Sequence, residues 1–589
     1  MTSWQDANAP VPVAFGPPRR QVAGILHRAG DRDSGLGVVI ASSIANEAVV
    51  SHRALRLLAR TLAARGMPAL LYDPPSSGDS AGDDGSPGRL AAWRESLGWA
   101  ASELRMRTGV GGIAVVGVRL GGTVAAWAVD EQLEIDALVL WDALSTGDEW
   151  LREERTYHLL ARQVPAERAG PPPTDGGEEL AGFLLAGDMV DELHHVDLAS
   201  RVPPPAWPAD LPVLLIEGPR RHRRSLGEPL RARGAHVESQ DVPGLAEMLE
   251  EAERAEPPTL AVEAIADWLS ARRPLHARDR VPESEPSSVL EDAGVCEQAF
   301  TVDGEAGRLF GVICEPAERP DEAREWVVLL NAGFVRHIGP NRLYVQWARE
   351  WARRGLPSLR LDGRSVGESD GSDGPHRSVT ELYSADAVAD AAALVDALAE
   401  RRGAETLTLV GLCSGAYMAF HLALRTPGVK RIVLLNPQIL SYDKESSERG
   451  QASYVRRSLL SPTKWRSMLA RRSAWRQLGD RLALLARTGI AAARRRVRRS
   501  PAEGAAGDWL VTALSTLRDQ GTDVQFVMSE SDPGLGYLAR HLGPELSGAP
   551  LELQLVRDAD HTFRTLDAQR RLTAIMDELV AGERERVAG

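Results

Sequence analysis

Cysteine is scarce in this 589-residue chain, which has only Cys296, Cys314 and Cys413. Three scattered thiols are too few for a disulfide framework or a cysteine-rich zinc site, and they favour a reducing, cytoplasmic setting. The sequence has no run of about 18 apolar residues, so no membrane-spanning helix is predicted. Its N-terminus lacks the basic start and the apolar core of a signal peptide.

Lysine is also scarce, since almost all of the 69 basic residues are arginine. The formal net charge of -13 argues against a general nucleic-acid-binding protein. A hydrophobic content of 43% and a charged content of 26% are ordinary for a soluble globular protein. The chain is too long for one hydrophobic core, so two to four domains are expected.

The most informative stretch is a predicted strand in the C-terminal half that runs into a sharp turn and a helix. The turn has the spacing Gly411-x-Cys413-x-Gly415. Glycines on both sides let the strand and helix pass closely while the central side chain stands clear of the sheet. A thiolate at a helix N-terminus is a strong nucleophile. Ser414 is the rival nucleophile, but choosing it would place Leu412 where the turn favours glycine. We therefore predict that Cys413 is the nucleophile.

Two later predicted strands end in residues that a cysteine nucleophile requires. One strand leads to Asp532 and the other to His561, so the nucleophile, acid and histidine follow in the order of a hydrolase triad. Taken singly, the first is equally consistent with a solvated acidic turn and the second with an exposed loop histidine. Together, at the ends of three successive strands, they predict the triad Cys413–His561–Asp532.

The two halves of the chain repeat one another at a spacing of about 290 residues. The aligned pairs include Asp73 with Asp362, Gly78 with Gly367, and Val116–Gly121 with Val410–Gly415. Each half alternates apolar strands with amphipathic helices, which is typical of a mostly parallel, doubly wound sheet. We interpret the chain as a duplicated α/β domain.

The first half, residues 1–273, lacks the catalytic set. Arg119 occupies the nucleophile position, no convincing acid follows the strand at Val213–Ile216, and no histidine occurs near Gly244, where one should fall. A guanidinium cannot attack a carbonyl and stays charged. The first half is therefore predicted to be a degenerate, non-catalytic domain.

A Pro-, Glu- and Arg-rich stretch, residues 274–292, is interpreted as an exposed linker before the second domain at 293–589. In that domain, the loop after the strand at 326–330 is predicted to supply one N–H to an oxyanion. We place this donor at Gly333, with Phe334 as the substitute, and the second donor at Ser414. Gly333 is equally consistent with an ordinary turn glycine.

A long insertion at about 440–520 separates the predicted strands that precede Asn436 and Asp532. Its many arginines are interleaved with tryptophan and leucine at helical spacing, which predicts a helical, basic cap. One interpretation is a cap that packs its apolar face on the core and leaves the arginines in water. The other is a docking surface for an anionic partner, such as a phosphopantetheine arm, an acidic carrier protein, CoA or a membrane face.

Residues 295–585 resemble the α/β-hydrolase superfamily, in its serine-aminopeptidase-like and thioesterase-like branch. The resemblance rests on Asn331-Ala-Gly333, the Asp362…Gly367-Glu-Ser369 turn, the Gly411–Gly415 elbow, Asp532 and Asp560-His561. It implies two tandem α/β-hydrolase domains, with a helical cap in the second. The pairing of a G-x-R-x-G half with a G-x-C-x-G half also resembles, more loosely, the paired hydrolases of exosortase-type gene clusters.

These features predict an acyl-transfer enzyme that forms an acyl-enzyme at Cys413 from an ester or thioester and passes the acyl group to an acceptor or water. An ester or peptide hydrolase of the same fold is one alternative, and a non-catalytic binding or scaffold protein is another. No metal or organic cofactor is expected. The expected partners are an acyl ester or thioester substrate, carrier-protein-bound or CoA-bound among the options, but no nucleic acid. Peripheral membrane contact through the basic cap stays open.

Overall fold

The computed structural model describes fourteen stretches of the chain. They are residues 9–30, 34–130, 133–161, 163–165, 168, 170–200, 207–208, 210–218, 226–272, 288–318, 324–372, 377–441, 502–543 and 552–582. None of the helices in this described part has the length and hydrophobicity needed to cross a membrane.

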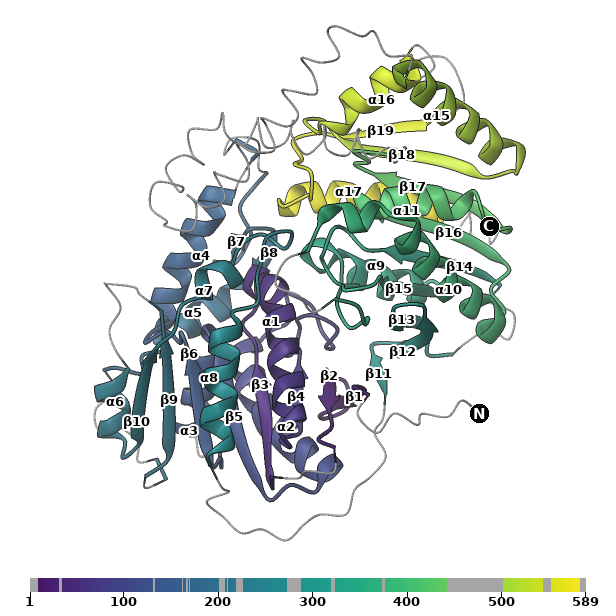
Figure 1. Cartoon of the computed structure of the whole chain (residues 1–589). Helices are drawn as coiled ribbons and strands as arrows, with labels where there is room; N and C mark the ends of the chain where they lie inside the picture. The colour runs from purple at the N-terminus through teal and green to yellow at the C-terminus, as the bar shows by residue number, and fades with distance from the viewer. Residues whose placement is uncertain are drawn as a thin grey trace, which may run out of the picture.

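The N-terminal half is built on an eight-stranded sheet in the order β1-β2-β4-β3-β5-β6-β9-β10 (Figure 1). Strands β1 and β2 pair antiparallel, β2 pairs antiparallel with β4, and the remaining neighbours are parallel. The strands are β1 (Val11–Phe15), β2 (Val22–His27), β3 (Leu36–Ala41), β4 (Ala69–Tyr72), β5 (Gly112–Val118), β6 (Ala137–Trp141), β9 (Pro212–Glu217) and β10 (His236–Asp241). A separate hairpin joins β7 (Glu178–Leu180) and β8 (Phe183–Leu185).

Helices cover both faces of this sheet, because alternate residues of its central strands are apolar on both sides. In β3, Val39 faces the hydrophobic cluster under α2 and α3, whereas Val38 and Ile40 face the cluster under α1 and α8. The helices are α1 (Ala45–Ala64), α2 (Arg89–Thr108), α3 (Leu120–Asp130), α4 (Gly147–Ala161), α5 (Gly187–His195), α6 (Gly227–Ala232), α7 (Leu245–Met248) and α8 (Thr259–Ser270).

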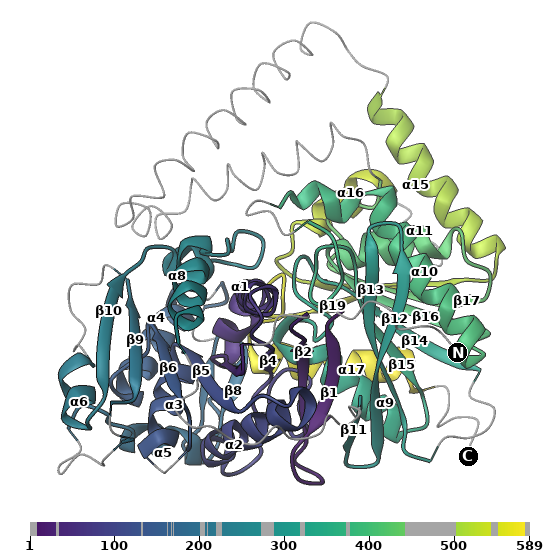
Figure 2. The same cartoon turned by 60° about the horizontal axis from the view of Figure 1, so that its bottom comes forward.

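The C-terminal half has a nine-stranded sheet in the order β11-β12-β13-β15-β14-β16-β17-β18-β19 (Figure 2). Apart from β11, this order matches that of the first sheet strand for strand. The strands are β11 (Val289–Asp292), β12 (Val295–Gly304), β13 (Gly307–Pro316), β14 (Glu325–Leu330), β15 (Ser358–Asp362), β16 (Thr406–Leu412), β17 (Val429–Leu435), β18 (Asp523–Ser529) and β19 (Glu552–Val556). The predicted fold class of two mostly parallel, doubly wound sheets is confirmed.

Helices again lie on both faces of the second sheet, with α10 and α11 over one hydrophobic cluster and α9 and α17 over the other. The helical segments are η2 (Pro340–Arg342), α9 (Leu343–Arg353), η3 (Val379–Tyr383), α10 (Ala385–Arg402), α11 (Ser414–Ala423), α15 (Ala502–Asp519), α16 (Gly534–Leu542) and α17 (Leu566–Val580). Most of the predicted cap at 440–520 lies outside the described residues, and its last part forms α15.

One predicted boundary needs correction. Residues 289–292 belong to β11, which pairs antiparallel with β12, so the predicted linker at 274–292 ends too late. The reason is that Leu290, in the apolar pair Val289-Leu290, is buried in a small cluster with Ala14 of the first half. The charged composition of residues 274–292 concealed this short apolar pair.

The two halves touch through loops at the carboxyl ends of their sheets. Arg56 of α1 donates to the carbonyls of Gly367 and Ser369, at 2.8 and 3.0 Å. In the opposite direction, Arg342 donates to the carbonyl of Gly78 at 2.7 Å. Each half therefore presents a guanidinium to the glycine–serine turn of the other.

Candidate active site

Cys413 stands at the point where β16 ends and α11 begins. Its backbone has φ 58° and ψ -110°, a conformation that side-chain-bearing residues rarely adopt and that is typical of a nucleophile elbow. A Cβ added to Gly411 would lie 2.1 Å from the backbone of Gly415, and one added to Gly415 would lie 2.7 Å from the carbonyl oxygen of Asn331. Both glycines are therefore required by the close approach of helix and strand.

Ser414, the rival nucleophile, is fully buried. Its hydroxyl oxygen accepts a hydrogen bond from the backbone N–H of Gly333 at 3.0 Å. The hydroxyl is thus committed to holding the loop after β14 against the elbow. Cys413, by contrast, keeps a partly exposed side chain.

Asp532 and His561 approach Cys413 from the loops after β18 and β19. His561 Nδ1 lies 2.5 Å from Asp532 Oδ2, and the Asp532 carboxylate is buried. The other carboxylate oxygen, Oδ1, accepts the backbone N–H of Gly534 at 2.7 Å. The histidine loop is fastened by Asn436, whose side-chain amide donates to the carbonyl of His561 at 2.8 Å. The structure therefore brings the three predicted side chains together.

The electrostatics of the histidine favour its charged form. Burial alone would lower the pKa of His561, but the charge and hydrogen bond of Cys413 and the bond to Asp532 outweigh it and raise the pKa well above 6.5. The protonated imidazole is stabilised by the Asp532 carboxylate on one side and by the Cys413 sulfur on the other. The arrangement is therefore suited to moving a proton between the Cys413 sulfur and a bound reactant.

Two further polar side chains at this site were not predicted. The Tyr383 hydroxyl lies 3.4 Å from Cys413 Sγ, and the Gln438 amide lies 3.4 Å from His561 Nδ1. Burial, followed by the charge at Cys413, raises the pKa of Tyr383 well above 10, so its hydroxyl keeps its proton and can donate it. Tyr383 belongs to a short 3-10 helix between β15 and α10, and no motif spacing connects it to the elbow.

One of the two predicted oxyanion donors has its N–H engaged by a neighbouring side chain. The Gly333 N–H is engaged with the Ser414 hydroxyl. Within the described residues, the backbone N–H groups of Phe334 and Ser414 have no hydrogen-bond partner. Phe334, the predicted substitute, is therefore better placed than Gly333 to pair with Ser414.

The N-terminal half reaches the mouth of this site. Glu253, in the segment between α7 and α8, has its Oε1 atom 2.9 Å from where a Cβ on Gly333 would lie. The Arg377 guanidinium lies 4.1 Å from the centre of the Phe334 ring in the same loop. The predicted donor loop is thus bordered by charged groups of both signs, one of them from the other half.

The corresponding elbow of the N-terminal half carries Arg119, with φ 54°. Its guanidinium is buried and bonds Glu47 at 2.7 Å, Asp142 at 3.1 Å and Glu153 at 2.6 Å. Burial would lower the pKa of Arg119, but the three carboxylates outweigh this effect and raise the pKa above its ordinary value. Near Gly244 the chain turns into α7 and offers no histidine. Arg119 is therefore a permanently charged side chain neutralised by carboxylates, and it has no histidine beside it to act as a base.

No group of three or more histidine, cysteine, aspartate or glutamate side chains in the described ranges is arranged to hold a metal ion. The predicted basic cap side chains between 442 and 501 lie outside these ranges and play no part in the geometry given above.

A family model described as serine aminopeptidase, S33, matches residues 322–478, a segment that contains the elbow and precedes Asp532 and His561. This match accompanies the strand order and elbow geometry of the second sheet. The C-terminal half belongs to the α/β-hydrolase superfamily. Its fold is of the α/β-hydrolase type.

Solved structures of α/β hydrolases align with about half of the chain. A serine hydrolase homologue from Coxiella burnetii is 14% identical, covers 47% of this chain and 97% of its own, and has a TM-score of 0.28. A dienelactone hydrolase from Anabaena variabilis is 12% identical, covers 49% and 97%, and has a TM-score of 0.29. A Pyrococcus furiosus esterase is 12% identical, covers 48% and 90%, and has a TM-score of 0.30. A search of curated protein sequences found no match.

Proposed function

We propose that the C-terminal half is an acyl-transfer enzyme that uses Cys413 as its nucleophile. The observation that carries this proposal is the contact chain from the Cys413 sulfur through His561 to Asp532, at the ends of three parallel strands. A cysteine on an elbow with an adjacent base and an orienting acid has the requirements of covalent catalysis.

In the first step, His561 takes the proton of the Cys413 thiol. Because Nδ1 of His561 faces Asp532, the proton is taken by Nε2. The sulfur then attacks the carbonyl carbon of an ester or thioester, and the carbonyl oxygen becomes an oxyanion. The backbone N–H groups of Phe334 and Ser414 stabilise this oxyanion by hydrogen bonds. As the tetrahedral intermediate collapses, the bond to the leaving group breaks and His561 gives that group its proton.

In the second step, an acceptor or water enters in place of the leaving group. His561 removes its proton, the acceptor attacks the thioester carbonyl, and the Cys413 sulfur leaves as a thiolate that is then reprotonated. Tyr383 is proposed to donate a hydrogen bond to that thiolate at both stages. Thiols and thioesters exchange readily, so a thioester donor suits a cysteine nucleophile and favours transfer over simple hydrolysis.

The donor is proposed to be an acyl group carried by CoA or by a carrier protein. The arginine-rich sequence between 456 and 499 supports an anionic carrier, although it lies outside the described residues. A plain ester or peptide hydrolase is the second candidate, and the serine aminopeptidase family model favours it. The N-terminal half is proposed to be non-catalytic, because Arg119 is locked among carboxylates.

Selective alkylation tests the nucleophile. Burial and nearby glutamates raise the pKa of Cys296, and burial raises that of Cys314 well above 9, so both should stay as unreactive thiols near neutral pH. Substoichiometric iodoacetamide should label Cys413 first in a peptide map, and His561→Ala should remove this preference. Equal labelling of all three cysteines in the wild-type chain would instead favour a non-catalytic binding protein.

A further inference from the structure

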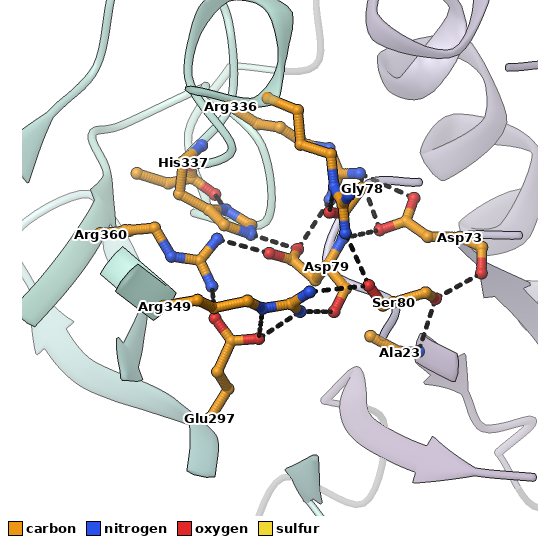
Figure 3. Close-up of polar contacts among 12 residues, drawn as sticks. Ala23, Asp73, Gly78, Asp79, Ser80, Glu297, Arg336, His337, Arg349 and Arg360 are labelled. Carbon is orange, nitrogen blue, oxygen red and sulfur yellow. Dashed lines mark hydrogen bonds and ion pairs between the residues drawn. The ribbon is translucent and has the colours of Figure 1, made fainter. Parts of the chain in front are cut away.

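The loop that carries the proposed oxyanion donor is held by the N-terminal half of the chain. Only two residues beyond Phe334, Arg336 crosses to that half (Figure 3). Its guanidinium contacts both carboxylate oxygens of Asp73, at 2.7 and 2.8 Å, and one oxygen of Asp79 at 3.1 Å. The Arg336 side chain is 9% exposed, so these ion pairs are shielded from water.

His337, the next residue, is clamped between the two halves. Its Nδ1 lies 2.7 Å from Asp362 of its own half, and its Nε2 lies 2.6 Å from Asp79 of the other half. Asp362 also accepts the backbone N–H of His337 at 2.7 Å and the side-chain amide of Asn331 at 3.1 Å. One carboxylate therefore ties both ends of the segment 331–337, and Asp79 fixes the imidazole from the far side.

The Asp79 carboxylate pairs with three cationic side chains of the C-terminal half. Besides Arg336 and His337 it pairs with Arg360 at 2.6 Å. Burial would raise the pKa of Asp79, but these cations outweigh it and hold the pKa well below its usual range. Without Asp79, buried positive charges would face one another with one carboxylate fewer, and an uncompensated buried charge is strongly unfavourable. Part of the negative charge that compensates these cations therefore comes from the N-terminal half, in addition to Asp362 and Glu297 of the C-terminal half.

We propose that Asp79, together with Asp73, is a positioning residue for the reaction at Cys413. By clamping Arg336 and His337, these aspartates set the backbone at Phe334 so that its N–H points to the developing oxyanion. The N-terminal half thereby acts as a built-in activator of the other half's chemistry. This inference rests on the proposed acyl transfer at Cys413.

Two reactions of the same sulfur separate positioning of the oxyanion loop from a general loss of structure. Acylation by p-nitrophenyl acetate forms a sulfur–carbonyl bond through an oxyanion, and nitrophenolate leaves. Alkylation by iodoacetamide forms a sulfur–methylene bond while iodide leaves, and no oxyanion arises. A displaced Phe334 N–H should therefore slow the first reaction and leave the second unchanged.

The experiment uses the full-length chain as wild type, Asp79→Asn and Arg336→Lys, with single-turnover acylation and iodoacetamide alkylation of Cys413 measured at one pH. We expect each variant to lose about 100-fold in acylation, as for a catalytic group misplaced by about 1 Å, while alkylation stays within about twofold. Arg56→Gln is the matched control. It removes another buried guanidinium between the halves, one that bonds the Gly367 and Ser369 carbonyls, and acylation should be preserved.

The outcomes are distinguishable. If circular dichroism shows that Asp79→Asn does not fold, the test rests on Arg336→Lys. This variant keeps the positive charge and loses only the forked contact with Asp73. Parallel losses in acylation and alkylation, or no loss in either, would overturn the positioning role while leaving the triad intact. A wild-type chain that is alkylated at Cys413 but never acylated there would overturn the proposed function itself, and the positioning role with it.

Discussion

The two elbows of this molecule have similar backbone conformations but different side-chain surroundings. Arg119 and Cys413 have φ values of 54° and 58°, and each follows the strand that holds the same place in its sheet. The Arg119 side chain is surrounded by carboxylates, whereas the Cys413 side chain lies beside a histidine and a tyrosine hydroxyl. The comparison teaches that the elbow only presents a side chain, and that the loops after other strands decide its chemistry.

The contact between the halves, unlike the two elbows, uses the same type of ion pair in both directions. Glu368 of the second half receives His52 at 2.7 Å, just as Asp79 of the first half receives His337 at 2.6 Å. Aligning Gly78 with Gly367 makes these two acids counterparts. The two histidines are not counterparts, since the same spacing aligns His52 with Asn341, so the symmetry of this contact is partial. The interpretation as a duplicated domain stays a prediction, and this symmetry is what it would lead one to expect.

The largest difference between the elbows should appear in turnover. Cys413→Ala should lower acyl transfer by about 10⁴-fold or more, since loss of a nucleophile leaves only binding and oxyanion stabilisation. Arg119→Met should leave turnover within about twofold when measured where the protein is folded. Steady-state rates with an acyl thioester test both. Equal losses in the two variants would mean that the halves share one site.

The free energy of unfolding should rank the two variants in the opposite order, with Arg119→Met losing more stability than Cys413→Ala. Arg119→Met strands Glu47, Asp142 and Glu153 around an uncharged side chain, and breaking a buried ion pair costs about 3–5 kcal/mol. Cys413→Ala removes one partly exposed sulfur and should cost about 1 kcal/mol or less. Urea unfolding curves measure both. A stable Arg119→Met chain would show that the carboxylates take up protons or solvent without penalty.

The inter-half contact should weaken in alkali. Burial lowers the pKa of His337, but Asp362 and Asp79 outweigh it and raise the pKa to about 9, from an ordinary value of 6.5. Its charge therefore stabilises the fold fully below pH 6.5, and this contribution is lost as the pH rises through about 9. Wild type should exceed His337→Gln in free energy of unfolding at pH 6, and the gap should narrow by pH 10. A constant gap would indicate that the imidazole stays neutral.

The smallest expected effect concerns Tyr383. Tyr383→Phe removes one hydroxyl 3.4 Å from the Cys413 sulfur and keeps the ring packed on Tyr417, so a loss of about 3–10-fold in turnover is expected, equivalent to one ordinary hydrogen bond. Tyr157→Phe, in the N-terminal half, is the matched control and should have no effect on turnover. If both behave alike, the tyrosine hydroxyl plays no part in the reaction.

The features that could be predicted from the sequence are those whose signal lies within a few consecutive residues. The elbow is a strand, a turn and a helix within a few residues, and its two glycines have a steric reason, so Cys413 was placed correctly on it. Asp532 and His561 could be placed because strong apolar strands precede them. The strands β1, β2 and β10 were not predicted. Strand β10 has a single apolar residue, Val237, at the edge of the sheet, whereas β1 and β2 are apolar but only five and six residues long.

The remaining site residues depend on tertiary contacts that no spacing encodes. Tyr383 reaches the sulfur from a 3-10 turn, and Asp79 reaches the oxyanion loop from the other half of the chain. The choice between Gly333 and Phe334 turned on one side chain, because the Ser414 hydroxyl engages the Gly333 N–H. A helical histidine such as His52 has no distinguishing sequence signal until its partner Glu368, 316 residues away, is known.

The central claim is that Cys413 carries an acyl group during turnover, and intact mass spectrometry tests it most directly. Brief incubation of the full-length chain with an acyl thioester, followed by acid quenching, should add one acyl mass, map to the peptide containing Cys413, and be absent in Cys413→Ala. An unmodified chain that nonetheless turns over substrate, or an acyl mass on any other residue, would contradict the account.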